Sequence, residues 1–272
     1  MASGLTLYHA AYSTCSQKVR LTLAEKRITF TSREISFARQ EQLDPEYLAI
    51  NPNGVVPTLV HDGAIITESS AIVEYLDEVF PEVPLTPADP VERAHMRAWL
   101  RFMEEVPTKA VRVPSFEKVF LPSLRLIKGT KAFQKDTDMR TVRQGFYGKM
   151  NQGKGFSVED IREADQHLSL TVERIEAALQ NGPWIMGTQL TLADLTLAPL
   201  IDRMLDLGCD APFQKAEKTL AWMDRLQTRP AYAEAFYKNT RLSERTEFQY
   251  ARLRNWVGSK LLPTKHTEDT DQ

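Results

Sequence analysis

The sequence predicts an α+β fold in which a mixed four-stranded sheet domain comes first and an all-helical domain follows. Short strand-like and helix-like segments alternate over residues 1–80, whereas residues 91–262 show almost only helical periodicity. Between the two, four of the eleven residues from Phe80 to Pro90 are proline. Proline cannot continue a helix and biases the preceding residue toward extended geometry, so we expect residues 81–90 to link the two domains.

Strand and helix signals alternate through the first domain. The strand-like runs are short and are either apolar or alternating, and the helix-like runs repeat their apolar residues at helical spacing. The expected elements are strand Leu5–Tyr8, helix Ser16–Lys26, strand Thr29–Ile35, helical turn Glu46–Ile50, strands Val56–Val60 and Ala64–Ile66, and helix Ser69–Phe80. Asp62-Gly63 favours a hairpin, while the strand-helix-strand start suits parallel pairing, so the sheet should be mixed.

Helical periodicity dominates the second domain. The expected helices are Val91–Val106, Ser157–Gln180, Leu192–Leu207, Ala216–Gln227 and Ala231–Tyr237. Two of them open with a hydroxyl residue followed three positions later by an acid, which is typical of a helix N-terminus. The helix from Leu192 is the most apolar, so we expect it to be central and buried. A C-terminal extension of mixed charge begins at Arg241, and the polar residues 263–272 are expected to be a disordered tail.

Charge is distributed unevenly along a chain whose net charge is only −2. Residues 109–154 hold eleven Lys or Arg and three acids, a balance of +8, so the remainder carries −10. This basic segment is interpreted as a solvated insertion in the helical domain, as an attractor of an acidic substrate, or as a surface facing an acidic partner subunit. A nucleic-acid binder is not expected, because the chain has no overall basic excess and no interleaved aromatic stacking motif.

Composition also bounds the cellular setting. Hydrophobic residues make up 42% of the chain and charged residues 26%, which are values of a globular protein. No apolar run approaches the ~18–20 residues of a membrane span, and the N-terminus does not resemble a secretory signal. The two cysteines, Cys15 and Cys209, form no disulfide framework, and the five histidines have no metal-ligand spacing. We therefore expect a cytoplasmic protein without a bound metal.

Three short motifs in the first domain point to a binding site for an anionic, peptide-like ligand. Tyr12-Ser13-Thr14-Cys15-Ser16 lies between the first strand and the first helix, where free backbone N–H groups hold anions and lower the pKa of a thiol. Asn53–Thr58 places Pro57 at a strand start, where a cis bond would present the backbone of Val56 to an extended ligand. Thr67–Ser70 puts a carboxylate and hydroxyls at a helix N-terminus. The alternatives are a capping serine, an ordinary trans proline and a simple capping motif.

Together and in this order, these motifs resemble the cytosolic glutathione transferase family over residues 4–240. Ser13 to Arg20 is similar to the zeta-class Ser-x-Cys motif, whose first serine activates the thiol. Asn51 to Leu59 resembles the cis-proline loop, and Glu68-Ser69 the pair that binds the γ-glutamyl group. Gly187 with Thr191 to Asp194 resembles the folding box of the central helix, in which Asp194 is structural. The first domain is thus expected to be thioredoxin-like.

A closer resemblance is to the bacterial lignin β-etherase branch of this family. It rests on several short stretches between Ile50 and Arg97 and on the long helical insertion and C-terminal extension. Ser13-Thr14-Cys15-Ser16 is richer in hydroxyl groups than expected for that branch and also resembles glutathione-dependent dehalogenases. The resemblance implies cleavage of β-aryl ethers with release of a phenol. A dehalogenase, a general conjugating transferase, an isomerase, or a heterodimer subunit that is inactive alone remain alternatives.

The resemblance assigns a role to each candidate residue, with glutathione as cosubstrate and no metal. The thiol would face Ser13, Thr14, Cys15 and Ser16, with Ser13 the preferred hydroxyl donor and Cys15 either passive or the centre of a thiol-transfer reaction. Glutathione would be held by Val56 at the cis-Pro57 loop, by Glu68 and Ser69, and by Arg39 or Gln42 at the glycyl carboxylate. An aromatic electrophile would lie against Tyr12, Phe102, Val106, Phe116, Phe120 and Tyr147, although core packing explains any one of these. A homodimer or a heterodimer with a related subunit is implied.

Overall fold

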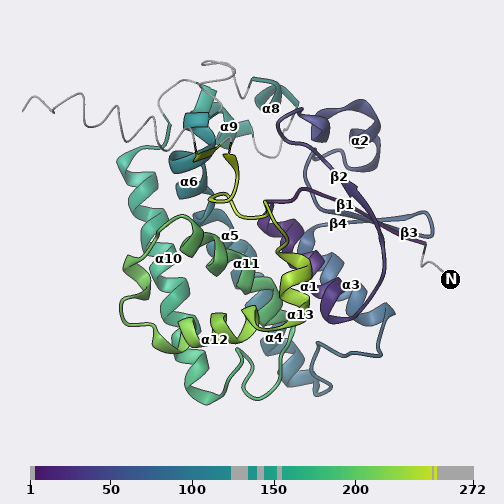
Figure 1. The fold of residues 1–272 in the computed structure, drawn as a ribbon, viewed down its shortest axis with the longest axis vertical. Coiled ribbons are helices and arrows are strands. Elements are labelled where there is room, and N and C mark those ends of the chain that lie inside the picture. The colour runs from purple at the N-terminus through teal and green to yellow at the C-terminus, as the bar shows by residue number, and fades with distance from the viewer. Residues whose placement is uncertain (1–3, 124–133, 140–143, 152–154, 247, 250–272) are drawn as a thin grey trace, which may run out of the picture.

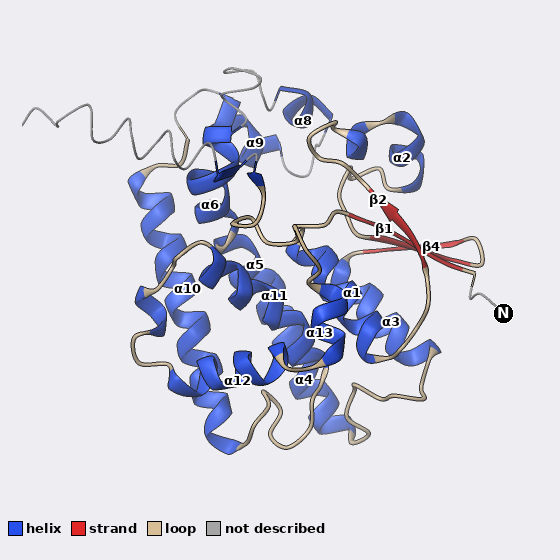
Figure 2. Ribbon diagram, viewed as in Figure 1, coloured by secondary structure: helices blue, strands red, loops and turns tan. Residues whose placement is uncertain are grey.

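The computed structural model describes residues 4–123, 134–139, 144–151, 155–246 and 248–249 (Figure 1). The sheet lies at one side of the molecule, and the helices of the second half of the chain gather beside it (Figure 2). The predicted tail, residues 263–272, falls outside the described residues. So do residues 124–133, 140–143 and 152–154 of the basic segment.

The first part of the chain forms the predicted mixed four-stranded sheet. Its strands are β1 Leu5–His9, β2 Thr31–Glu34, β3 Thr58–His61 and β4 Ala64–Thr67. Their order across the sheet is β2-β1-β3-β4, with β1 parallel to β2 and antiparallel to β3, and β3 antiparallel to β4. The Asp62-Gly63 hairpin has positive φ at both residues, as a tight two-residue turn requires. The strand predicted at Thr29–Ile35 is shorter at both ends.

This register brings all three motifs of the first domain to one edge of the sheet. Tyr8 pairs with Thr58, and Thr58 pairs with Thr67, so the end of β1, the start of β3 and the end of β4 coincide. β2 runs parallel to β1 and ends at the same edge. The segments that extend past these strand ends are the loop to Ser13, the Val56-Pro57 loop, Glu68-Ser69 and the stretch from Ile35 to Gln42. Segments far apart in sequence therefore converge.

Two long helices cover the sheet, and two short helical turns lie between β2 and β3. They are α1 Thr14–Glu25, α3 Ser69–Val79, η1 Glu41–Leu43 and α2 Pro45–Ile50. α1 is buried continuously from Ser16 to Leu23, because α3 lies beside it and α11 and α13 of the helical half also contact it. Its polar residues therefore need partners across that junction. Gln17 Nε2 donates to the Thr240 carbonyl at 3.0 Å, and Lys18 Nζ donates to Thr108 Oγ1 at 3.2 Å.

The second part of the chain is helical, as predicted. Its helices and helical turns are α4 Pro90–Glu105, α5 Pro107–Ala110, α6 Arg112–Ser115, the π-helical turn η2 Phe116–Phe120, α8 Gln134–Met139, α9 Gln144–Asn151, α10 Val158–Ala178, η5 Leu179–Asn181, α11 Leu192–Asp206, η6 Ala211–Phe213, α12 Glu217–Gln227 and α13 Pro230–Ala235. α11 is the central helix, buried at every residue from Leu192 to Met204. α4 and α13 each begin at a proline, one residue before the predicted start, because proline suits the first helical position.

Candidate active site

The N-terminus of α1 forms one wall of a pocket between the sheet edge and the helical half. Ser13 has extended geometry (φ −77°, ψ 119°) and caps the helix, accepting a hydrogen bond from the Ser16 N–H at 3.3 Å. A serine hydroxyl that accepts a bond still carries its own proton, so capping and donation to a ligand are compatible. Ser13, Thr14 and Cys15 line the pocket. Ser16 is fully buried and accepts from the Ala10 N–H at 3.2 Å, so it supports the loop and does not line the pocket.

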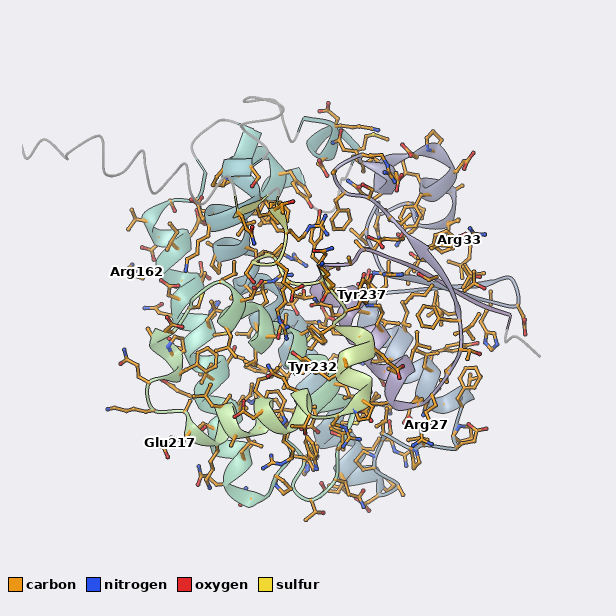
Figure 3. The ribbon with its side chains drawn as sticks, in the orientation of Figure 1. Arg27, Arg33, Arg162, Glu217, Tyr232 and Tyr237 are labelled. Atoms are coloured by element: carbon orange, nitrogen blue, oxygen red, sulfur yellow. The ribbon has the colours of Figure 1, made fainter. Side chains whose placement is uncertain are left out.

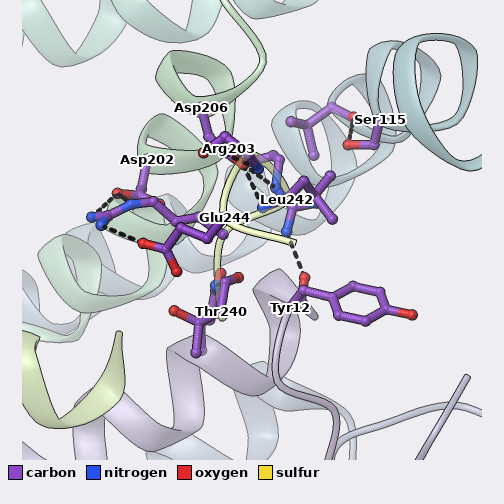
Figure 4. Close-up of polar contacts among 12 residues, drawn as sticks. Tyr12, Ser115, Asp202, Arg203, Asp206, Thr240, Leu242 and Glu244 are labelled. Carbon is purple, nitrogen blue, oxygen red and sulfur yellow. Dashed lines mark hydrogen bonds and ion pairs between the residues drawn. The ribbon is translucent and has the colours of Figure 1, made fainter. Parts of the chain in front are cut away.

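Two buried arginines hold this loop in place. Arg20 donates to the carbonyls of Ala10 at 3.2 Å and Ala11 at 2.7 Å, and its Nε donates to Ala235 on α13 at 3.1 Å. From the other side, Nη2 of Arg203 on α11 donates to the Tyr12 carbonyl at 2.5 Å (Figure 4). Burial lowers the pKa of Arg20 to about 10, which leaves it charged at neutral pH. The loop that presents Ser13 is therefore fixed by both halves of the chain.

His9 is the third buried support of the loop. Its Nδ1 accepts from Arg20 Nη1 at 3.1 Å, which leaves the proton on Nε2, and Nε2 donates to Ser32 Oγ at 2.7 Å. Burial, reinforced by the charge of Arg20, lowers the pKa of His9 from 6.5 to about 4. The imidazole is thus held neutral in one tautomer.

Acid should destabilise the protein through His9. The unfolded chain takes up a proton at this residue below pH ~6.5, whereas the folded chain does not until about pH 4. Stability supplied by His9 is therefore complete above pH ~6.5 and is lost as the pH falls toward 4, by up to about 3 kcal/mol. Urea unfolding at pH 7, 6, 5 and 4 should show a steeper loss for the wild type than for His9→Gln. Parallel losses in the two proteins would contradict this account.

The facing wall of the pocket comes from the loop before β3 and from η1. Tyr47 Oη and Asn51 Nδ2 both donate hydrogen bonds to the Val55 carbonyl, at 2.6 and 2.9 Å. These two bonds fix the position of the loop. The Val56-Pro57 bond is cis, as the resemblance to the cis-proline loop implied, and Val55 and Val56 line the pocket. Across the described residues, no hydrogen bond occupies the Val56 backbone N–H or carbonyl. An extended ligand could therefore pair with it as an added strand does.

Gln42 and Arg39, the two candidates for a carboxylate contact, differ in placement. Gln42 is 3% exposed and lines the pocket, and its Oε1 has no hydrogen-bond partner within the described ranges. A buried polar atom without a partner is costly unless a ligand or water satisfies it. Arg39 is exposed, and its guanidinium pairs with Glu41 at 2.7 Å. Of the two, only Gln42 lies in the pocket.

Glu68 and Ser69 lie at the start of α3, at the same sheet edge but outside the pocket lining. Glu68 has φ +65°, a conformation that costs a non-glycine residue about 1–3 kcal/mol and that is found most often at functional sites. Ser69 is buried, and its Oγ donates to Glu104 Oε1 at 3.3 Å. The same Glu104 oxygen lies 3.6 Å from Nζ of the fully buried Lys18. Ser69 is therefore hydrogen-bonded to Glu104, which in turn pairs with Lys18.

Aromatic side chains from both halves of the chain form a wall of the pocket. The aromatic side chains that line it are Tyr12, Phe37, Phe116, Phe120, Phe146 and Tyr147. The Phe116 ring lies 5.0 Å from both Phe120 and Phe146 in edge-to-face contact. Four of these six were predicted from the sequence, and Phe37 and Phe146 were not. Arg112 and Arg203, which also line the pocket, were missed as site residues.

Two residues predicted for this wall lie elsewhere. The guanidinium of Arg174 on α10 lies 4.2 Å from the centre of the Phe102 ring, which also packs against Trp99. Val106 lines a second, separate groove together with Phe156 and His167. Tyr12, Phe116, Phe120 and Tyr147 are the members of the predicted substrate set that the structure brings together.

The first residues of the C-terminal extension lie against the same pocket. Arg241 makes a two-pronged ion pair with Asp202 on α11, with Nη2 2.7 Å from Oδ1. The Leu242 N–H donates to Asp206 at 2.8 Å. Further along, Phe248 packs on Tyr12 and Phe120 at 5.7 and 5.5 Å. Figure 4 shows Asp202, Arg203 and Asp206 on one helix, with the Arg203 guanidinium in direct contact with the Tyr12 carbonyl. The extension therefore covers the outer side of Tyr12.

Comparison with known protein families identifies this architecture. Residues 7–84 match the model of the glutathione S-transferase N-terminal domain, and residues 144–230 match that of the C-terminal domain. The chain belongs to the glutathione transferase family. That family uses glutathione as cosubstrate, which agrees with a pocket built around the start of α1 and an open backbone edge.

Individual relatives of this glutathione transferase carry several activities in their names. Protein LigF of Sphingobium sp. strain SYK-6 is 31% identical over 87% of this chain and 95% of its own length. A probable maleylacetoacetate isomerase of Caenorhabditis elegans is 32% identical over 79% and 87%. A tetrachloro-p-hydroquinone reductive dehalogenase of Sphingobium chlorophenolicum is 23% identical over 85% and 95%. The crystal structure of beta-etherase LigF superposes with a TM-score of 0.74, covering 86% of this chain and 98% of that one at 28% identity.

Within the described ranges, none of the helices combines the length and apolarity that a membrane span requires. Likewise, no three His, Cys, Asp or Glu side chains within the same ranges come together as ligands for a metal ion.

Proposed function

We propose that this glutathione transferase cleaves β-aryl ethers of lignin-type aromatics, releasing a phenol and forming a glutathione thioether. The observation that carries this proposal is the pocket itself, which combines Ser13, Thr14 and Cys15 at a helix N-terminus with six aromatic rings. The similarity to LigF over most of both chains supports the same choice.

The residues around the pocket fit glutathione in an extended pose. The unoccupied backbone of Val56 would pair with the cysteinyl residue, and the Nε2 amide group of Gln42 would donate to the glycyl carboxylate. Glu68 and Ser69, at the same sheet edge, would hold the γ-glutamyl end. This pose directs the thiol toward the N-terminus of α1. Cations and helix N-termini favour the ionised form of a thiol, and the buried Arg203 adds positive charge at the same pocket.

In the proposed reaction Ser13 donates a hydrogen bond to the glutathione sulfur and stabilises the thiolate. Each unit by which the thiol pKa falls corresponds to about 1.4 kcal/mol, which a hydroxyl donor and a helix N-terminus together can supply. The thiolate then attacks the carbon that bears the aryl ether. A C–S bond forms, the C–O bond breaks, and the electron pair leaves with the phenoxide, which takes a proton from water.

Other electrophiles are the second candidate for this site. Cys15 lines the pocket beside Ser13, and the relatives include a dehalogenase and a probable isomerase. A chain that transfers glutathione through a Cys15 mixed disulfide, or a heterodimer subunit that needs a partner to turn over, would share the same geometry. We also propose that the protein is cytoplasmic and dimeric.

Turnover of resolved enantiomers of a β-aryl ether ketone tests the proposal. The purified chain is incubated with glutathione and each enantiomer, and phenol and thioether are measured by mass spectrometry. We expect the two products in equal amounts from one enantiomer. If a chain that binds glutathione releases no phenol, ether cleavage by this chain alone is wrong. A native mass spectrum then separates a missing partner subunit, indicated by a lone monomer, from a different electrophile, indicated by a homodimer.

A further inference from the structure

Two aromatic rings of the pocket are packed against a third ring from the C-terminal extension. Tyr12 and Phe120 line the pocket with their ring centres 5.8 Å apart. The ring of Phe248 lies 5.7 Å from Tyr12 and 5.5 Å from Phe120, and Phe248 itself is not one of the described residues that line the pocket. We propose that Phe248 is a positioning residue, which fixes the two lining rings where they meet the aryl group of the electrophile. This inference rests on the proposed function, since it concerns the electrophile side of the same site.

Phe248 meets both lining rings edge-to-face, which is a favourable arrangement for aromatic pairs. The interplanar angles are 89° to Tyr12 and 81° to Phe120. The side chain is buried in a small hydrophobic cluster that it shares with Val119 and Leu207. Truncating Phe248 would leave a cavity beside both rings, into which they could move. The aryl group of a ligand would then lose contacts on this side of the pocket.

The extension that carries Phe248 is fastened to the central helix α11 by two acidic residues. Asp206 Oδ2 accepts a hydrogen bond from the Leu242 N–H at 2.8 Å. Asp202 pairs with Arg241, and Tyr232 of α13, labelled in Figure 3, donates to the same carboxylate at 2.6 Å. The start of the extension is therefore held to the helical half of the protein by hydrogen bonds and an ion pair.

The backbone of the loop that presents Ser13 has other supports. Arg203 donates to the Tyr12 carbonyl, and Arg20 donates to the two carbonyls that precede it. These two arginines come from α11 and α1 and not from the extension. Removing the Phe248 ring should therefore release the Tyr12 side chain and leave the loop backbone in place. The aryl group should lose affinity, whereas glutathione should not.

Binding of S-benzylglutathione and of glutathione tests the proposal without any need for turnover. The two ligands differ only in the benzyl group on the sulfur, and calorimetry gives both affinities. We expect Phe248→Ala to bind S-benzylglutathione about ten-fold more weakly than the wild type and to bind glutathione equally well. Phe248→Leu keeps apolar bulk in the same place and should retain part of the lost affinity. The pKa of the bound glutathione thiol should be the same in both variants as in the wild type.

Phe213→Ala is the matched control. Phe213 and Phe248 are both 6% exposed, but Phe213 packs in the main core and is not among the described lining residues. This control should keep the wild-type ratio of the two affinities. A Phe248→Ala protein in which both affinities fall by the same factor, or in which neither falls, would overturn the proposal. If Phe248→Ala does not fold, the comparison is made with Phe248→Leu, and an unchanged ratio there has the same meaning.

The binding data also separate this inference from the proposed function. If the wild type binds neither ligand, the glutathione site is wrong and both fall together. Phenol release from the β-aryl ether, combined with an unchanged affinity ratio in the Phe248 variants, refutes this inference alone. A changed ratio in a protein that releases no phenol supports the role of Phe248 and refutes ether cleavage.

Discussion

Replacing Ser13 by glycine is expected to lower kcat/KM for glutathione transfer by about 100-fold or more while leaving the fold intact. Ser13 caps α1 and lines the pocket, so two roles must be separated. Glycine caps a helix almost as well as serine, at a cost of only a few tenths of a kcal/mol, but it has no hydroxyl to donate. Steady-state kinetics with a generic chloroarene electrophile and urea unfolding of the same preparations measure the two effects.

Two further variants serve as controls for the Ser13 result. Ser13→Thr keeps both the hydroxyl and the cap, and we expect it to retain most of the activity. Cys15→Ala removes the neighbouring thiol, and it should retain the activity as well. The reverse pattern, with Cys15→Ala inactive and Ser13→Gly active, would refute the hydroxyl mechanism and assign the chemistry to a mixed disulfide on Cys15.

The largest loss of stability is expected from Asp194→Ala. Asp194 is fully buried at the start of α11, where it accepts four hydrogen bonds. Oδ1 accepts from the Ile185 N–H and from Trp222 Nε1, both at 2.9 Å, and Oδ2 accepts from the Thr191 N–H at 2.9 Å and from Thr191 Oγ1 at 3.2 Å. Alanine would leave these donors buried without a partner. We expect the free energy of unfolding to fall by about 3–5 kcal/mol, measured by urea denaturation.

Asp160→Ala tests whether burial is the reason for that loss. Asp160 closes the same kind of capping box on α10, where its carboxylate accepts from the Ser157 N–H at 2.9 Å, but this box is exposed to solvent. Water can replace its bonds, so the expected loss is only about 1 kcal/mol. Similar losses for the two variants would show that Asp194 stabilises the protein only as a helix cap, and that the burial of its four hydrogen bonds adds nothing.

The structural features that were predicted best are those that a few neighbouring residues determine. The Asp62-Gly63 hairpin, the capping boxes at Ser157 and Thr191, and the buried central helix are all present in the structure. Each depends on local backbone chemistry or on the apolar content of one segment. The ends of helices were predicted less accurately, because they depend on which residue caps the helix. α1 begins at Thr14, two residues before the predicted start, since Ser13 and not Ser16 is its N-cap.

The candidate site was most directly predicted where a motif lies within one loop. Ser13 and Val56 were named from such loops, and they line the pocket. Arg203 could not be named, because only the packing of α11 against α1 brings it to Tyr12. Phe102 was expected in the pocket but is not among the residues that line it, although the sequence pattern of α4 indicates which face of the helix is buried. Met96, Leu100 and Met103 form its buried face at helical spacing, and Phe102 points to another side of that helix.

The direct test of the account is the pKa of the glutathione thiol bound to the protein. The ultraviolet absorbance of the thiolate, measured as a difference between complex and free components across pH 5 to 10, gives this value. We predict that the bound thiol ionises at least about one unit below its usual pKa of ~8.5, and that Ser13→Gly returns it toward that value. A bound thiol that titrates like free glutathione would contradict the claim that the start of α1 activates it.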